Sequence, residues 1–166
     1  MSFINVRRGK YGVYNGKLYR ILSKSISLKS DIIEICSTDE QDLENGFMNN
    51  DSEFFTKKYG FTCTKEIHKS EITEVYEIVT HAIYKGLTCG IIGGRNGTNL
   101  LTLAAPYEFP HNPTGEMLEI RNNLVEMGFH DAIHEKTFCM YIIEVDMDDP
   151  ELELVEEITE SDISKL

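Results

Sequence analysis

The stretch Val13–Lys17, VYNGK, is echoed further along the chain by Ile83–Leu87, IYKGL. Alternating apolar positions follow in both cases, in Leu18–Ile21 and in Thr88–Ile91. Alternation with a period of two is typical of a strand that buries one face. Both stretches therefore predict a strand, a turn and a second strand.

Three further matches occur in the same order in the two halves of the chain. They are an apolar strand at 31–35 and 99–103, a Gly-Phe pair at 46–47 and 128–129, and a closing phrase at 71–78 and 151–158. Four matches in one order over most of a sequence indicate that one unit is present twice. We therefore assign residues 1–79 to a first β-rich repeat and residues 80–166 to a second.

The fold class that follows is mainly β (α+β), with two small curved sheets or SH3-like barrels. The expected strands are 11–22, 30–36, 63–68 and 74–83 in the first repeat, and 86–93, 98–104, 137–145 and 153–158 in the second. The segment 37–46 of the first repeat predicts a turn or two of helix, with Leu43 as its one apolar anchor.

One main helix is expected in the second repeat, over residues 115–127. Thr114 can cap its start, and Gly128 suits the left-handed position just past its end. The apolar residues at helical spacing are Met117, Ile120, Leu124 and Met127. Such a stripe predicts a helix with one face in the core.

The glycine-rich stretch Cys89–Asn99, CGIIGGRNGTN, has the composition of a phosphate-binding loop. Such a loop needs a helix N-terminus directly after it, and here the strand pattern of Leu100–Leu103 follows instead. Asn96-Gly97 is the strongest short signal for a hairpin turn, because both positions tolerate a positive φ. We therefore predict a turn between two strands.

Candidate catalytic and metal-binding patterns are weak. His130 and His134 would share a face if their segment were helical, but the Gly-Phe pair before them favours a turn and a strand. Residues 146–149 resemble half of a calcium loop without its turn glycine and bidentate glutamate. No nucleophile motif occurs. We expect no enzyme activity, no metal and no cofactor.

The remaining composition points to the cytoplasm. The 166 residues include no apolar run of signal-peptide or membrane-span length. The cysteines lie far apart, without a C-x-x-C pair, so we expect reduced and buried thiols. They are Cys36, Cys63, Cys89 and Cys139.

The formal net charge of −12 is unevenly distributed along the chain. Residues 1–30 carry bases and no acids, residues 31–56 carry acids and no bases, and residues 144–160 form a second acidic run without Lys or Arg. Such a charge disfavours binding to nucleic acid or to anionic membranes and favours a basic partner. Plain solubility is the alternative explanation of acidic runs.

The motifs VYNGKLYRI, DIIEICS, GF, KEIHKSEITEVYEI and AIYKG resemble, in this order, those of small acidic immunity proteins. These proteins belong to bacterial polymorphic-toxin and contact-dependent inhibition systems. The resemblance implies a monomeric inhibitor that binds a cognate toxin domain, often a nuclease with a basic cleft. The alternatives are a small-ligand-binding protein or enzyme with a site between the two repeats, and an adaptor without a toxin.

The resemblance transfers no functional residue, so the candidate contacts follow from charge and from aromatic side chains. Acidic loops give a fast, steered encounter, and an exposed aromatic ring can supply a buried anchor. The candidates for binding a toxin are Asp39, Glu40, Asp42 and Glu44 near the first Gly-Phe pair, Asp146, Asp148, Asp149 and Glu151 in the second repeat, and Tyr59 and Tyr107.

Overall fold

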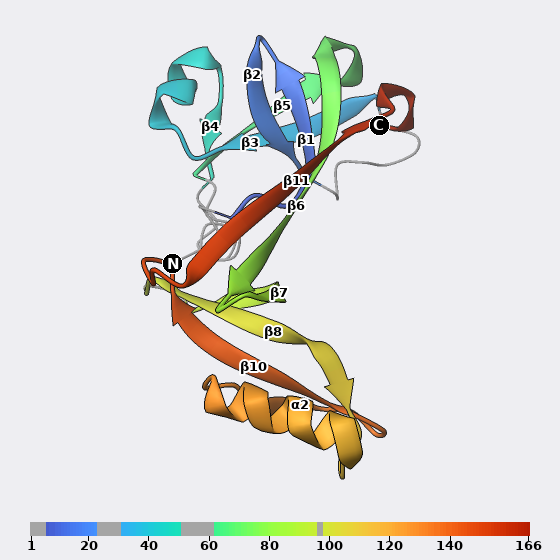
Figure 1. The fold of residues 1–166 in the computed structure, drawn as a ribbon. Helices are drawn as coiled ribbons and strands as arrows, with labels where there is room; N and C mark the ends of the chain where they lie inside the picture. Colours follow the sequence, from blue (N-terminus) through green and yellow to red (C-terminus); the bar gives the residue numbers. More distant parts are fainter. Residues whose placement is uncertain (1–5, 23–30, 51–61, 96–97) are drawn as a thin grey trace. The chain divides into compact units, whose positions relative to one another are not determined.

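The computed structural model describes residues 6–22, 31–50, 62–95 and 98–166, with Ile133 and His134 described by their backbone alone. Strands dominate, and α2 (Gly115–Glu126) is the main helix of this part of the chain (Figure 1). The predicted fold class, mainly β with one main helix in the second half, is confirmed. The chain forms two compact units, residues 2–80 with 156–166, and residues 81–155.

The first unit is an antiparallel sheet in the order β4-β5-β3-β2-β1-β6. Its core packs Ile33 and Ile35 of the central strand against Phe47, Ile67 and Val75. Its elements are β1 (Gly9–Tyr14), β2 (Lys17–Ile21), β3 (Ile32–Ser37), η3 (Glu40–Asn45), β4 (Met48–Asn49), β5 (Cys63–His68), η4 (Lys69–Glu71), the first part of β6 (Ile72–Tyr84) and η5 (Ile163–Lys165).

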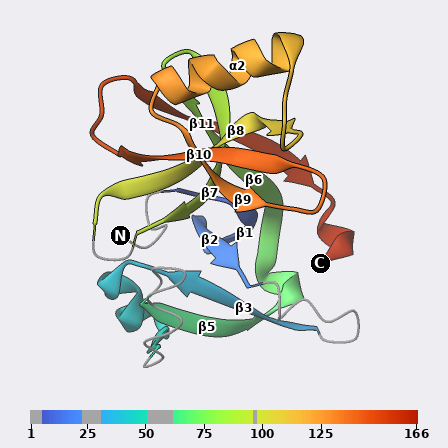
Figure 2. The same ribbon diagram turned by 90° about the horizontal axis from the view of Figure 1, so that it is seen from below.

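The second unit has the strand order β6-β7-β8-β10-β9, again antiparallel. Helix α2 packs against β8 on one face of this sheet (Figure 2). The ring of Phe109 lies 5.2 Å from that of Tyr141 in an edge-on contact within the core. Its further elements are β7 (Leu87–Gly94), β8 (Leu100–Phe109), β9 (His130–His134), β10 (Cys139–Asp146) and the start of β11 (Leu152–Ser161), which pairs with β6.

The two units share one strand order. In each, three strands form a meander, a helix follows the third, and a short edge strand and a longer strand complete the sheet. The registers match as well, because Arg20 pairs with Cys36 in the first unit and Gly90 pairs with Ala104 in the second. This is the arrangement that the repeated motifs predict.

The two hairpins owe their shape to the residues of their turns. Asn15 and Gly16 have φ values of 50° and 77°, and Lys85 and Gly86 have values of 50° and 79°. Two successive positive φ angles define the type I′ turn, whose twist matches that of the flanking strands. The matching phrases of the sequence thus form the same turn twice.

The Gly-Phe pairs end the helical segments in the same way. In the first unit the N–H groups of Gly46 and Phe47 donate to Leu43 O and Asp42 O, at 3.4 and 3.2 Å. In the second unit Gly128 N and Phe129 N donate to Val125 O and Leu124 O, at 3.0 and 2.9 Å. These pairs of bonds are those of a Schellman motif, which needs a left-handed residue at the glycine. Both phenylalanines are buried.

Two expectations about helices meet different outcomes. The helix predicted over 115–127 is α2, although the Thr114 side chain makes no capping hydrogen bond. The expected anchor of the first-half segment is wrong, because Leu43 is exposed and Asp42 is buried. The hydrophobic pattern predicted that Leu43 would be buried, but hydrogen bonds hold the carboxylate of Asp42 in the interior instead.

Two stretches considered as candidate functional sites form strands in the structure. The backbone of His130–His134 forms β9, an edge strand, as the turn-and-strand prediction requires. The glycine-rich stretch contains most of β7 and leads into β8, which pairs with β7 in an antiparallel manner. The predicted turn residues Asn96 and Gly97 lie outside the described residues. No helix in the described ranges is both long and apolar enough to cross a membrane.

Candidate functional site

The first acidic set surrounds η3, and the structure divides it. Asp42 is 1% exposed, so it is not available as a rim contact for a partner. Its Oδ1 atom accepts the Tyr19 hydroxyl at 2.9 Å, and its Oδ2 atom accepts the Ser37 hydroxyl at 2.5 Å and Lys17 Nζ at 2.8 Å. The prediction that Asp42 binds a toxin is therefore corrected, because its carboxylate holds η3 onto the sheet.

The electrostatics of this network agree with its geometry. Burial alone would raise the pKa of Asp42, but hydrogen bonds from Lys17, Ser37 and Tyr19 together hold that pKa below its ordinary value. Burial and the bond to Asp42 raise the pKa of Tyr19 to about 12. The network therefore keeps a negative charge on Asp42 and a proton on Tyr19 at neutral pH.

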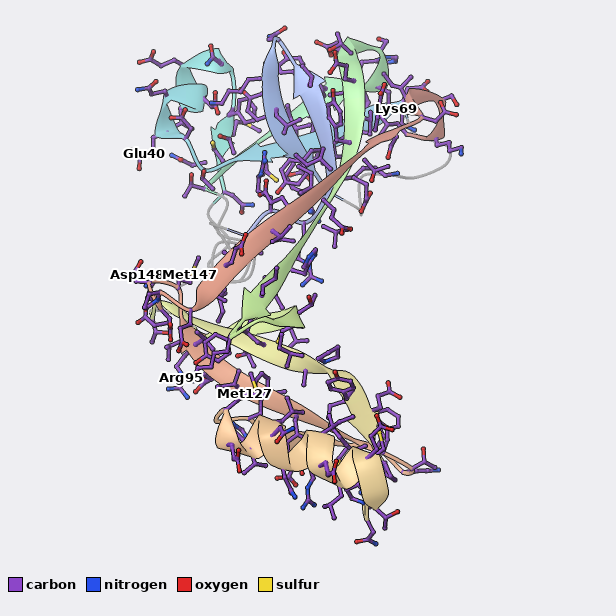
Figure 3. All side chains as sticks on the ribbon, in the orientation of Figure 1. Glu40, Lys69, Arg95, Met127, Met147 and Asp148 are labelled. Atoms are coloured by element: carbon purple, nitrogen blue, oxygen red, sulfur yellow. The ribbon has the colours of Figure 1, made fainter. Side chains whose placement is uncertain are left out.

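Asp39 is engaged as well. Its Oδ1 atom accepts Gln41 N at 3.0 Å at the start of η3, and its Oδ2 atom accepts Lys17 Nζ at 2.9 Å. Glu40, labelled in Figure 3, and Glu44 are exposed on the same segment. Of the first set, these two glutamates are the side chains that a partner could reach most readily.

The second acidic set lies at the end of β10 and on the loop that leads to β11, and Asn99 contacts it through both its side chain and its backbone. Asn99 Nδ2 donates to Asp146 Oδ1 at 2.8 Å and to Asp148 Oδ2 at 2.9 Å, so one amide joins two carboxylates. Met147 N also donates to Asn99 O at 2.8 Å. Met147 and Asp148 are labelled at this loop in Figure 3. Asn99 thus fixes the loop to the start of β8.

Two turns built on aspartate shape the loop itself. Asp146 Oδ1 accepts Asp148 N at 2.9 Å, and Asp149 Oδ1 accepts Glu151 N at 2.8 Å. Such turns let an aspartate side chain replace a backbone acceptor. The residues Asp146, Asp148 and Glu151 are exposed, and Asp149 is half-buried. The loop therefore presents ordered carboxylates to solvent.

Two cations border this loop at longer range. Lys85 Nζ lies 3.7 Å from Glu151 Oε2, and Arg95 Nη2 lies 3.3 Å from Glu144 Oε2. Arg95 is labelled in Figure 3. Both pairs are largely solvent-exposed, where such contacts contribute little to stability.

The two aromatic candidates differ in what can be said of them. Tyr107 lies on β8, half-buried, with its ring 6.0 Å from that of Phe109. It is therefore partly a core residue rather than a free anchor. Tyr59 lies outside the described residues.

Sequence reasoning did not identify the side chains that order the two acidic sets. Lys17, Tyr19 and Ser37 come from strands next to η3, and Asn99 is 47 residues from Asp146. The available signal was the repeat itself, since the hairpin positions Lys17 and Tyr19 correspond to the apolar Leu87 and Cys89. In the first unit these two positions carry polar side chains that donate to Asp42.

The four cysteines are core residues rather than reactive groups. All four are free and buried, and burial raises the pKa of Cys89 to about 11. Thiols in this state are poor nucleophiles. Within the described ranges, no three His, Cys, Asp or Glu side chains group as metal ligands would.

Fold and surface together define a mainly β protein with a repeated strand order and an ordered acidic loop. The chain belongs to the family described as "uncharacterised conserved protein UCP033725", whose model matches residues 6–109. This match runs from the first described residue to the end of β8. No curated protein and no solved structure matches the chain.

Proposed function

We propose that this protein is an immunity protein that binds a basic toxin domain through the loop Asp146–Glu151. The observation that supports this proposal most is that the loop is ordered. Asn99 Nδ2 donates to the carboxylates of Asp146 and Asp148, at 2.8 and 2.9 Å. In this proposal the protein acts as a monomer in the cytoplasm, and the toxin domain is a nuclease with a basic cleft.

Preorganisation is what separates this loop from an ordinary acidic surface. A partner that binds mobile side chains must pay the entropy of ordering them, about 0.5–1.5 kcal/mol for each side chain. Here the two aspartate turns and the Asn99 amide already hold the loop backbone and two carboxylates. Binding energy is therefore available for the partner's cations.

The charge around the loop favours the same partner. Between residues 81 and 155 the only lysines and arginines are Lys85, Arg95, Arg121 and Lys136. A surface of one dominant sign speeds the encounter with a partner of the opposite sign. The cleft of a nuclease has to hold phosphates, so it carries positive charge, opposite to that of this loop.

The test is protection of cells against the toxin domain encoded next to this gene. The loop variant carries Asp148→Lys and Glu151→Lys, and the matched control carries Glu40→Lys and Glu44→Lys, with the same change of charge in the first unit. We expect the loop variant to lose protection and the control to keep it. Circular dichroism and thermal unfolding establish that both variants fold.

Association kinetics give a second readout with the purified domains. The loop variant should associate at least about tenfold more slowly at low salt, with a smaller dependence on salt than the wild type. Full protection by a folded loop variant would exclude this loop from the mechanism. Loss of protection in both variants would mean that net charge, and not this loop, matters.

A further inference from the structure

The end of β11 is an uncovered strand edge within the first unit. The residues Glu156–Glu160 are all exposed, five in succession. A strand with one face on a core buries every second residue, so neither face of this stretch is covered. Over the described part of the chain β6 is the one strand that pairs with β11. Among the described residues, therefore, no strand lies beside its outer edge.

Such an edge offers backbone N–H and C=O groups to any strand of suitable chemistry. Its side chains include Glu156, Glu157 and Glu160, with Ile158 at 54% exposure between them. Arg7 donates to both carboxylate oxygens of Glu156, at 2.9 and 2.6 Å, which fixes that side chain across the sheet. Glu157 and Glu160 are exposed, so they present their charge to solvent.

The charges decide which strand fits this edge. A second copy of the chain, paired antiparallel along Glu156–Glu160, would bring glutamates of both copies side by side. Like charges opposite one another destabilise a strand pair, whereas opposite charges stabilise it by about 0.2–1 kcal/mol per pair. The edge therefore disfavours self-association and favours a strand that carries Lys or Arg.

We propose that residues Glu156–Ser161 of β11 bind an extended, Lys- or Arg-bearing strand of the partner protein by adding it to the sheet. Backbone hydrogen bonds give the strand its place, Glu157 and Glu160 select its cations, and Ile158 gives it an apolar contact. The basic character of the partner rests on the proposed function, but strand addition is a separate property of this edge.

The first experiment uses synthetic peptides as probes, so it needs no toxin domain. One peptide alternates Lys with Val and Thr, a second has Glu in place of each Lys, and a third is the Lys peptide with N-methyl groups on alternate residues. We expect the Lys peptide to bind at least about tenfold more tightly than the other two at low salt. Amide hydrogen exchange should slow at alternate residues of 156–161.

Equal binding of the Lys peptide and its N-methylated form would overturn the proposal, because charge alone would then explain it. So would unchanged exchange along β11. If Glu157→Gln with Glu160→Gln makes the protein dimerise while no peptide binds, the glutamates serve only to prevent self-association. That result would also overturn strand addition.

The second experiment uses proline, which removes one backbone N–H. Neighbouring residues of a strand direct their N–H groups to opposite sides, so one of Ile158→Pro and Thr159→Pro breaks the pairing with β6 and the other removes an outward donor. Thermal unfolding distinguishes the two variants, because the one that loses only an outward donor should be the more stable. That variant should bind the Lys peptide at least about fivefold more weakly, and unchanged binding would contradict the proposal.

The two proposals fail separately. If the peptide binds to β11 but no neighbouring toxin domain binds the protein, the proposed function is wrong and the strand edge stands. If the toxin domain binds and is inhibited while the outward-proline variant inhibits it equally well, the strand edge is wrong and the proposed function stands.

Discussion

Asp42 and Leu124 occupy equivalent positions in the two units. Each backbone carbonyl accepts the N–H of the phenylalanine that follows a left-handed glycine, at 3.2 Å for Asp42 and 2.9 Å for Leu124. Both side chains are buried, at 1% and 2% exposure. One unit thus fixes its helical segment with a hydrogen-bonded carboxylate and the other with an apolar side chain.

The residues around Asp42 and around Leu124 also differ in polarity. Tyr19 and Ser37 donate to Asp42, whereas the matching positions of the second unit are Cys89 and Ala105. A buried donor without an acceptor costs about 1–3 kcal/mol, while exchange of donor and acceptor together for apolar groups can be nearly neutral. The polar set should therefore be replaceable as a whole but not in part.

Asp42→Leu alone should lower the free energy of unfolding by about 2–4 kcal/mol, because it leaves Tyr19 and Ser37 without their acceptor. The triple variant with Tyr19→Phe and Ser37→Ala should recover most of this loss. Urea denaturation of the three proteins measures both values. A triple variant no more stable than Asp42→Leu would show that shape, and not the two donors, requires a carboxylate here.

The pKa of Asp42 gives a dependence on pH with a defined sign. A carboxyl whose pKa is lowered on folding stabilises the fold above its unfolded pKa, about 3.9, and that contribution disappears as the pH falls through the folded pKa. Asp42→Asn should therefore be less stable than the wild type at pH 7, and the difference should shrink below about pH 4. Urea midpoints between pH 7 and pH 3 measure it, and a constant difference would contradict the assignment.

The elements that depend on neighbouring residues could be predicted from the sequence. The hairpin turns and the Gly-Phe ends of η3 and α2 are examples, because a glycine that needs a positive φ is a local signal. The inward position of Asp42 could not be predicted, since the Tyr19 hydroxyl that it accepts comes from 23 residues away. The periodicity predicted that Leu43 would be buried, because it depends on apolar positions and contains no information about a distant hydrogen-bond donor.

The acidic loop shows the same limit. Its charge and its place after β10 could be read from the sequence, but its order could not, because Asn99 reaches it from 47 residues away. Nor could the sequence tell that Asp39 is paired with Lys17 while Glu40 remains exposed. Contacts between distant residues, rather than composition, separate structural carboxylates from available ones.

Gly128→Ala tests the shared helix end. Gly128 has a φ of 101°, and an added Cβ would lie 3.2 Å from Ile143 Cδ1. We expect a loss of about 1–2 kcal/mol in the free energy of unfolding, from the backbone conformation alone. The matched control is Gly90→Ala in the same unit, where no atom lies within 4 Å and φ is not positive. An equal loss in both variants would contradict a role for the left-handed conformation.

The thiols should be unreactive in the folded protein. All four cysteines are buried, and the pKa of Cys89, raised to about 11, leaves very little thiolate at pH 8. Reaction with a disulfide reagent at pH 8 should be slow in native buffer and complete within minutes in guanidinium chloride. Fast labelling of Cys89 in the native state, located by mass spectrometry, would contradict its burial.

Asn99→Ala tests whether the acidic loop is held in place from outside. The change removes the amide that joins Asp146 and Asp148, while the bond from Met147 N to the backbone of residue 99 can persist. Loss of about 1 kcal/mol of local stability corresponds to roughly fivefold faster amide exchange at Asp148. Asn123→Ala on the exposed face of α2 is the control and should leave that exchange unchanged. Because Asn99→Ala changes no charge, any weaker binding of the basic partner would report the loss of loop order alone. Exchange as slow as in the wild type would mean that the two aspartate turns hold the loop without Asn99.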